Sequence, residues 1–183
     1  AEAALAQTED IISTFNALLR IAQIEAGDRR ERFQRTDLRS LVTNVHEAFE
    51  PSAEDAGQFL QLKTSDQPVT VLGDPDLLMQ LASNLVENAL RHTPKGTTIA
   101  LEATYLGGLP ALCVSDTGPG IASEDREKVF RRFYRGEKSR TTGGNGLGLS
   151  LCKAITELHH ANLEVSDNHP GLRIEARFPP PAK

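Results

Sequence analysis

The segment GGNGLGLSL, from Gly143 to Leu151, places four glycines within six positions and then runs into a stretch with helical spacing. Glycine in regular structure is destabilising by about 0.5 to 1 kcal/mol relative to alanine, so the cluster needs a physical reason. The first turn of a helix presents unpaired N–H groups and the positive end of the helix dipole, which favour phosphate. The segment is neither a Walker A loop, because no Lys-Ser/Thr follows, nor a Rossmann fingerprint, because no strand leads directly into it.

A second motif, VSDTGPGI, follows a stretch that alternates like a strand. The predicted strand ends at Asp116, and Gly118 and Gly120 then permit a tight turn against which a planar ligand can lie. A carboxylate in this place can accept hydrogen bonds from the exocyclic amine of adenine. The alternative is an ordinary turn in which the aspartate bonds its own backbone.

A third motif lies in the predicted helix LASNLVENALRHTPKG. Asn84, Asn88 and Arg91 are four and three residues apart, so they share one helix face, distinct from the leucines. Such a face is costly to bury without polar partners, and a solvated polar stripe is the alternative interpretation. Together with the Asp-Gly-Pro-Gly turn and the glycine segment, however, it indicates a nucleotide-binding site.

The chain from residue 36 onward alternates predicted helices and strands. Asp74 and Pro75 are typical of a helix start, and that helix is expected to end before Pro94 and to bury Leu78, Leu81, Leu85 and Ala89. Strands are expected within residues 58–64, 69–74, 97–105, 109–116, 162–166 and 171–178, with a hairpin turn at Gly107 and Gly108. The predicted fold class is α+β, a two-layer sandwich of a mixed, mostly antiparallel sheet with helices on one face.

Residues 1–27 are predicted to form one amphipathic helix of a larger bundle. One row of apolar residues recurs every seven positions: Leu5, Ile12, Leu19 and Ala26. Phe15 and Ala22 form a second row beside it, and Ile11 and Leu18 widen the apolar stripe. A single helix cannot cover this stripe, so another helix is the expected partner. We predict a linker over 28–35, a second domain over 36–183, and within it a charged, mobile lid at about 121–145.

Composition excludes several classes of protein. The formal net charge of −5 is not typical of nucleic-acid binding, and no apolar run is long enough to span a membrane, so neither contact is expected of this chain. Cys113 and Cys152 lie in apolar segments and are predicted to be small buried side chains rather than a disulfide, which fits a cytoplasmic setting. The five histidines show no zinc-binding spacing.

Four segments in this order resemble the asparagine, first glycine, phenylalanine and second glycine boxes of two-component sensor histidine kinases. They are NLVENALRHTPKG, DTGPGI, FRRFYRG and GGNGLGLSL. The resemblance covers residues 36 to 179 and implies the ATP-binding fold shared with gyrase-type ATPases, a heat-shock chaperone and mismatch-repair ATPases. It implies an ATP-dependent protein-histidine kinase.

The resemblance also implies roles for individual residues in binding ATP and Mg²⁺. Asp116 would hold the adenine amine, Asn88 would coordinate Mg²⁺, and Asn84 would support the metal and the phosphates. Arg91 would reach phosphate oxygens, and His92 would lie near the nucleotide. The remaining predicted nucleotide-binding residues are Gly118, Gly120, Ile121, Gly144, Gly146, Leu147, Gly148 and Leu149.

Asn84 occupies the position at which hydrolytic relatives carry a glutamate. Because an amide cannot act as a general base, the sequence favours holding ATP for transfer to a histidine over hydrolysing it. Glu87 is an alternative base. In the lid, Arg131 and Arg135 are predicted to neutralise charge on the transferring phosphoryl group, and Phe130 and Phe133 to anchor the lid to the domain.

The phosphoacceptor motif H-E-x-R-T-P of the resembled family is absent from this sequence. We therefore expect residues 1–27 to be the second helix of a dimeric bundle, with the phosphoacceptor helix lying outside this chain and a response regulator as a further partner. Many members of the family are membrane-anchored, so the parent protein is a candidate for anchoring in the inner membrane. The alternatives are an ATPase of the same superfamily and an interaction module that binds no nucleotide.

Overall fold

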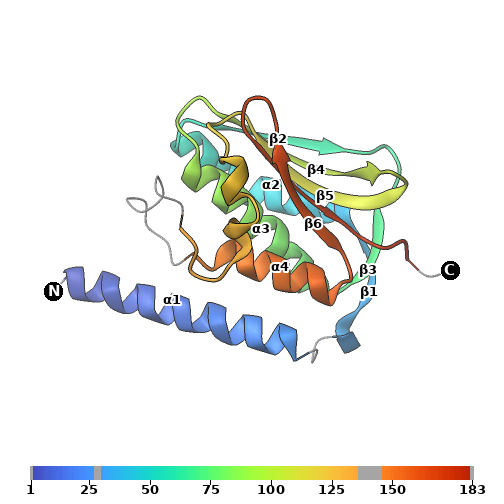
Figure 1. Cartoon of the computed structure of the whole chain (residues 1–183). Coiled ribbons are helices and arrows are strands. Elements are labelled where there is room, and N and C mark those ends of the chain that lie inside the picture. The colour runs from blue at the N-terminus through green and yellow to red at the C-terminus, as the bar shows by residue number, and fades with distance from the viewer. Residues whose placement is uncertain (1, 27–29, 136–145, 182–183) are drawn as a thin grey trace.

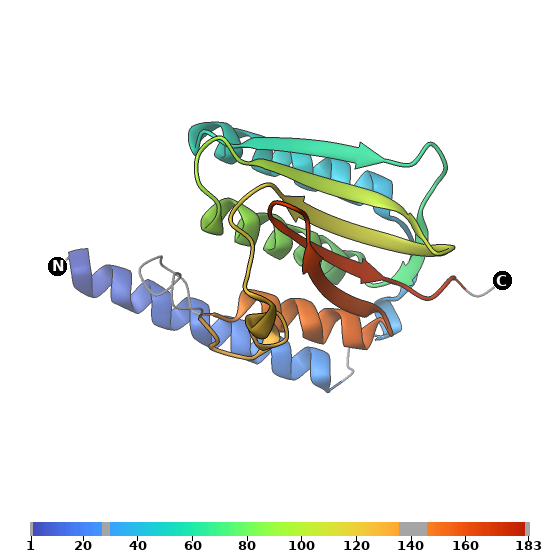
Figure 2. The same cartoon turned by 45° about the horizontal axis from the view of Figure 1, so that its top comes forward.

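The computed structural model describes residues 2–26, 30–135 and 146–181, with side chains described from Ile12 onward except Ser13. One long helix runs beside an α/β unit in which three helices cover one face of a sheet (Figures 1 and 2). The helices are α1 (Glu2–Glu25), α2 (Leu38–Asp55), α3 (Pro75–His92) and α4 (Gly148–Leu158), with short 3₁₀ helices η1 (Arg30–Arg32), η2 (Ser123–Asp125) and η3 (Lys128–Phe130). The strands are β1 (Gln34–Asp37), β2 (Phe59–Thr64), β3 (Thr70–Gly73), β4 (Thr98–Leu106), β5 (Leu109–Asp116), β6 (Asn162–Asp167) and β7 (Leu172–Arg177).

The main sheet has five strands in the order β2-β4-β5-β7-β6. Only the β2–β4 pair is parallel, and the other three pairs are antiparallel. The β4–β5 hairpin turns through Gly107 and Gly108, both at positive φ, as the sequence predicted. The predicted α+β class, with a mixed, mostly antiparallel sheet and helices on one face, is confirmed.

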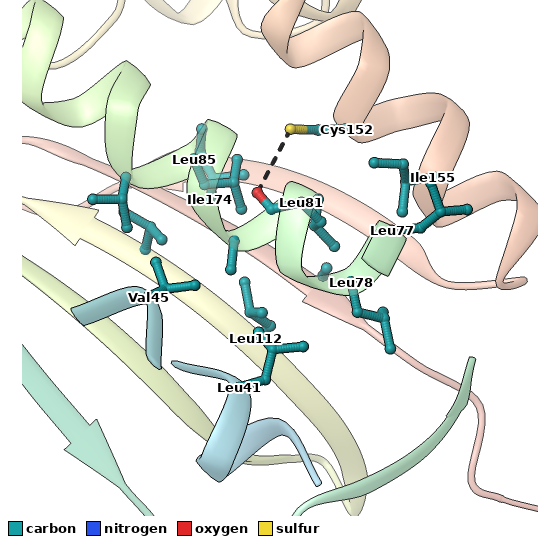
Figure 3. Close-up of a cluster of buried hydrophobic side chains, with 14 of the residues drawn as sticks. Leu41, Val45, Leu77, Leu78, Leu81, Leu85, Leu112, Cys152, Ile155 and Ile174 are labelled. Carbon is teal, nitrogen blue, oxygen red and sulfur yellow. Dashed lines mark hydrogen bonds between the residues drawn. The ribbon is translucent and has the colours of Figure 1, made fainter. Parts of the chain in front are cut away.

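Helix α3 lies at the centre of the helical layer. Asp74 caps its first turn by accepting hydrogen bonds from the backbone N–H groups of Asp76 and Leu77, and Pro75 occupies the first helical position, as predicted. The four side chains that the sequence assigned to the core, Leu78, Leu81, Leu85 and Ala89, are at most 5% exposed. Figure 3 shows how α3 presents its leucines to α2, to α4 and to the sheet.

Both cysteines are buried and free, as the sequence predicted. Cys152 on α4 lies over the Leu81 carbonyl (Figure 3). Cys113 lies on the opposite face of the sheet, beside Glu102 and Glu175 in the strand register, and burial raises the pKa of its thiol to about 12. Neither thiol is therefore ionised near neutral pH.

Strand β1 was not expected from the sequence, which placed its first residues in a linker. Gln34 to Asp37 pair antiparallel with β3 in a separate two-stranded sheet. The segment is polar and short, so it carries no alternation of apolar residues that would identify a strand. Its last residue, Asp37, accepts hydrogen bonds from Arg39 N–H at the start of α2 and from Val69 N–H.

Helix α1 packs along α4 (Figure 2). Ile21 and Ile24 are 1% and 3% exposed against the domain, whereas Ile12, Phe15 and Leu19 are 53%, 63% and 48% exposed. Part of the apolar stripe that the sequence assigned to a partner helix is thus exposed. Leu18 of the same stripe is instead half-buried against the core, beside Ile21 and Ile24, which the stripe did not include. The predicted Leu5 and Ile11 side chains lie outside the described residues.

His159, which follows α4, joins three parts of the fold. Its Nε2 accepts a hydrogen bond of 3.1 Å from the Asp74 N–H, and its Nδ1 donates to the Ile155 carbonyl at 2.7 Å. The ring stacks on Phe33, with centroids 4.6 Å apart, and meets Phe178 edge-on. Burial, opposed in part by the Ile155 hydrogen bond and the nearby Asp74, lowers the pKa of His159.

This lowered pKa makes stability depend on pH. The folded state holds His159 neutral, so below its unfolded pKa of about 6.5 the unfolded chain binds more protons and folding is disfavoured, by up to about 1.4 kcal/mol per pH unit. We expect the free energy of unfolding to fall from pH 7.5 to 5.5 in the wild-type chain and to fall less in His159→Gln, measured by urea titration. Equal slopes in the two chains would contradict this interpretation of His159.

Candidate nucleotide-binding site

Asp116 ends β5 as the sequence predicted, and one oxygen of its carboxylate is fixed by the backbone. Oδ1 accepts hydrogen bonds from the N–H groups of Gly118, at 2.8 Å, and Leu172, at 3.3 Å. No described residue bonds Oδ2, so this oxygen is available to an amine donor. Burial raises the pKa of the Asp116 carboxyl, and the two N–H bonds offset part of that rise.

The turn between β6 and β7 also supports Asp116, although sequence analysis did not identify it. Asn168 donates a hydrogen bond of 2.8 Å to the Asp116 carbonyl, and Leu172 supplies one of the carboxylate bonds. A Cβ on Gly171, which has φ of 111°, would overlap the Asp116 carbonyl, so only glycine permits this approach. Gly120 lies against Gly171 from the other side.

The two asparagines on the polar face of α3 are half-buried, and their side chains have no hydrogen-bond partner among the described residues. The Nδ2 atom of Asn84 is buried without a hydrogen bond, and no described residue bonds the side chain of Asn88. Because a buried polar group without a partner is destabilising, this face has the property expected of a surface that a polar ligand covers. Glu87 and Arg91 instead form an exposed ion pair of 2.5 Å.

His92 follows at the end of α3, where it meets the lid. Partial desolvation, followed by the positive charges of Arg91 and Arg135, lowers the pKa of His92. Arg135 of the lid is thus one of two positive charges that act on His92.

The N-terminus of α4 has no side-chain cap. Leu147 occupies the capping position and is buried, while Gly148 begins the helix with open space beside its Cα. No described residue accepts a hydrogen bond from the N–H groups of Gly148 or Leu149. Such a turn is suited to an anion.

Gly146 has a different role from Gly148. At φ of 65° it packs against the lid backbone, where an added Cβ would lie 2.9 Å from the Tyr134 carbonyl oxygen, and its own carbonyl accepts a hydrogen bond from Phe133 N–H. Its lack of a side chain thus serves the contact between lid and glycine segment. Gly144 lies outside the described residues.

The described part of the lid contains two short 3₁₀ helices, η2 and η3. Ile121 and Leu149 pack against the core. Phe133 is 56% exposed at φ of 61°, so the prediction that it anchors the lid to the domain is wrong: the residue turns the chain toward Gly146 and leaves its ring in solvent.

Arg131 is not brought together with the other predicted residues. Its side chain is exposed and lines a hollow of about 650 Å³ between the lid, α4 and β6. Asn84, Asn88 and Asp116 do not line this hollow.

Asp116, the polar face of α3 and the start of α4 together offer three kinds of contact. They are a carboxylate oxygen for an amine, amide groups for a hydrated cation or phosphate, and free backbone N–H groups for an anion. No group of three or more His, Cys, Asp or Glu among the described residues could hold a metal ion. Amide oxygens are hard ligands of the kind that a Mg²⁺ ion accepts when it keeps several waters and is shared with ligand phosphates. Within the described chain no helix is long and apolar enough to cross a membrane.

Comparison with known proteins places this arrangement in a family. A family model described as histidine kinase-, DNA gyrase B- and HSP90-like ATPase matches residues 73–182. The sensor-like histidine kinase SenX3 of Mycolicibacterium smegmatis is 31% identical over 169 residues, covering 90% of this chain and 43% of that protein. The signal transduction histidine-protein kinase BaeS of Escherichia coli K12 is 38% identical over 147 residues, covering 78% of this chain and 31% of that protein.

Solved structures show the same fold. Full-length ShkA in complex with AMPPNP has a TM-score of 0.79 at 24% sequence identity, covering 97% of this chain and 37% of that one. The chain thus spans less than half the length of these relatives. Because the family model matches more than half of its residues, the chain belongs to the histidine kinase-, DNA gyrase B- and HSP90-like ATPase family, and the relatives named above are sensor histidine kinases.

Proposed function

We propose that this chain is the ATP-binding catalytic part of a two-component sensor histidine kinase. It would hold Mg-ATP for transfer of the γ-phosphoryl group to a histidine outside this chain. The names of its relatives and the AMPPNP complex of ShkA support this proposal. The phosphoryl group would pass onward to an aspartate of a response regulator.

The observation that carries the proposal is the environment of the Asp116 carboxylate. Two backbone N–H groups orient Oδ1, and Oδ2 is left for an external donor, which suits the exocyclic amine of adenine. Gly118 and Gly120 would shape this pocket beside Ile121. The start of α4 has no side-chain cap, so it and the segment before it would contact the phosphates. The residues concerned are Gly144, Gly146, Leu147, Gly148 and Leu149.

The amides of α3 would complete the site. Asn88 would coordinate Mg²⁺, and Asn84, with its buried and unpartnered nitrogen, would support the metal and phosphates. Arg91, His92 and the lid arginines Arg131 and Arg135 would face phosphate charge when the lid closes. When bound, Mg-ATP supplies a γ-phosphoryl group with its charge partly neutralised.

The chain's own residues favour transfer over hydrolysis. Asn84 cannot take a proton from water, and the exposed Glu87 carboxylate is bonded to Arg91. A neutral imidazole is already a good nucleophile and needs no strong base. ATP hydrolysis through Glu87 is the second candidate, which the labelling experiment below distinguishes.

The exposed row on α1 supports a second proposed feature. Ile12, Phe15 and Leu19 are spaced three and four residues apart and are uncovered, which suits packing against helices of a homodimeric bundle. A receiver domain of a response regulator would be the second partner, and the parent protein would work at the cytoplasmic side of the inner membrane.

Replacing Asp116 by asparagine tests the adenine contact. Because Oδ1 is held by two N–H donors, the side-chain amide of the Asp116→Asn variant would turn its own NH₂ toward the ligand amine. We expect ATP affinity to fall by about 10- to 150-fold, which corresponds to about 1.5 to 3 kcal/mol, as measured by isothermal titration calorimetry.

The matched control is Asp55→Asn, which removes an exposed carboxylate at the end of α2 and should leave ATP affinity unchanged. Because burial raises the pKa of the Asp116 carboxyl, this group should become protonated at a higher pH than an exposed aspartate. The difference in ATP affinity between wild type and Asp116→Asn should therefore become smaller as the pH is lowered. Equal affinity of wild type and Asp116→Asn at neutral pH would remove Asp116 from the site.

Incubation with Mg²⁺ and ATP labelled on the γ-phosphate tests the reaction assigned to this chain. We expect bound, largely intact ATP and no protein-linked phosphate, because the phosphoacceptor motif is absent. The label would be divided by filtration and acid–base stability into bound ATP, free phosphate and phosphohistidine, with Asp116→Asn as background. Fast phosphate release would indicate an ATPase, and stable phosphohistidine on this chain would contradict the proposal.

A further inference from the structure

Gln58 lies immediately before β2, outside every motif identified in the sequence, and is 4% exposed. Its backbone N–H bonds the Ala53 carbonyl at the end of α2. Neighbouring backbone atoms of Gly57 and Phe59 bond the loop that follows α3, through Gly96 and Thr97. These bonds hold Gln58 in place from both sides.

The Gln58 side chain binds the C-terminal end of α3. Its Nε2 lies 3.0 Å from the Leu90 carbonyl oxygen, 2.7 Å from the Thr93 carbonyl oxygen and 2.8 Å from Thr93 Oγ1. Two of these partners are carbonyls, which can only accept, so the nitrogen must face them. Gln58 thus satisfies acceptors at the end of a helix that has no intrahelical donors for them.

This orientation leaves Gln58 Oε1 buried without a hydrogen bond among the described residues. An unpaired buried acceptor is unfavourable and offsets part of the stability that the bonds from Nε2 contribute. The bonds that remain fix the position of Thr93 and of the end of α3.

Thr93 contacts both Gln58 and Gly118, and so connects Gln58 to the candidate site. Its hydroxyl donates to the Ala89 carbonyl at 2.8 Å and so is left to accept from Gln58. Its methyl group packs against Gly118, where an added Cβ would lie only 2.7 Å from Cγ2. Gly118 N–H in turn makes the 2.8 Å hydrogen bond that orients Asp116 Oδ1.

We propose that Gln58 is a positioning residue for base selection, acting through Thr93 and Gly118 on the Asp116 carboxylate. The inference rests on the proposed function, since it concerns recognition of the adenine amine. Gln58 touches neither the base nor the phosphates. Its effect is to hold the acceptor of Asp116 in the direction that an amine donor needs.

The test compares ATP with inosine triphosphate, whose base carries an oxo group in place of the amine, in Gln58→Met. Methionine keeps the length of the side chain but removes both the unpaired oxygen and the bonds to Leu90 and Thr93, so a urea titration of the variant checks its stability beside the binding measurement. We expect ATP affinity to fall by about 5- to 10-fold and affinity for inosine triphosphate by less than about 2-fold, measured by competition with a fluorescent ATP analogue.

Gln61→Met is the matched control, because Gln61 is an exposed glutamine on the adjoining strand β2, and it should change neither affinity. Thr93→Val keeps the shape of Thr93 and removes the hydroxyl; combined with Gln58→Met it should lose no more discrimination than either change alone. Equal losses for both nucleotides, or unchanged discrimination in Gln58→Met, would overturn the inference. A wild-type chain that binds neither nucleotide would overturn the proposed function itself.

Discussion

The fixing of helix α3 at both ends is the constraint on which the candidate site depends. At its start, Asp74 caps the helix and His159 accepts from the Asp74 N–H. At its end, Gln58 binds the last carbonyls. Between these ends the leucines of α3 are buried in the core, so the helix can neither slide nor rotate without breaking polar bonds. Its polar face, with Asn84 and Asn88, is thereby held in one orientation.

Three parts of the described chain have unmet hydrogen-bonding capacity. Among the described residues, the buried amide nitrogen of Asn84 and the Oδ2 atom of Asp116 have no hydrogen-bond partner, and α4 begins without a side-chain cap. Each of these features opposes folding of the isolated chain, and burial of the Asp116 carboxyl adds to them by raising its pKa. They lie on α3, at the end of β5 and at the start of α4, and both β5 and α4 contact α3.

The sequence predicted the elements whose signals are local. Helix α3 could be identified because its cap, its proline and its apolar spacing are all within one segment, and Asp116 because the strand and turn that present it are contiguous. The support of Asp116 could not be predicted, since Asn168 and Leu172 are 52 and 56 residues away and become neighbours only when β7 pairs with β5. The role of Gln58 could not be predicted either, because its partners Leu90 and Thr93 become its neighbours only in the folded chain. Strand β1 was missed because its pairing with β3, not its composition, defines it.

Helix α1 carries two sets of apolar side chains, one buried against the domain and one exposed. The seven-residue repeat identified the row now exposed at Ile12, Phe15 and Leu19, while Ile21 and Ile24 pack on the domain beside α4. Full burial of an isoleucine contributes about 1.5 to 3 kcal/mol, whereas the surface ion pair between Arg132 of the lid and Glu25 of α1 contributes about 1 kcal/mol at most. Apolar packing therefore fixes α1 on the domain. Because α4 both contacts α1 and begins at the proposed phosphate contact, displacement of α1 would expose a surface of this same helix.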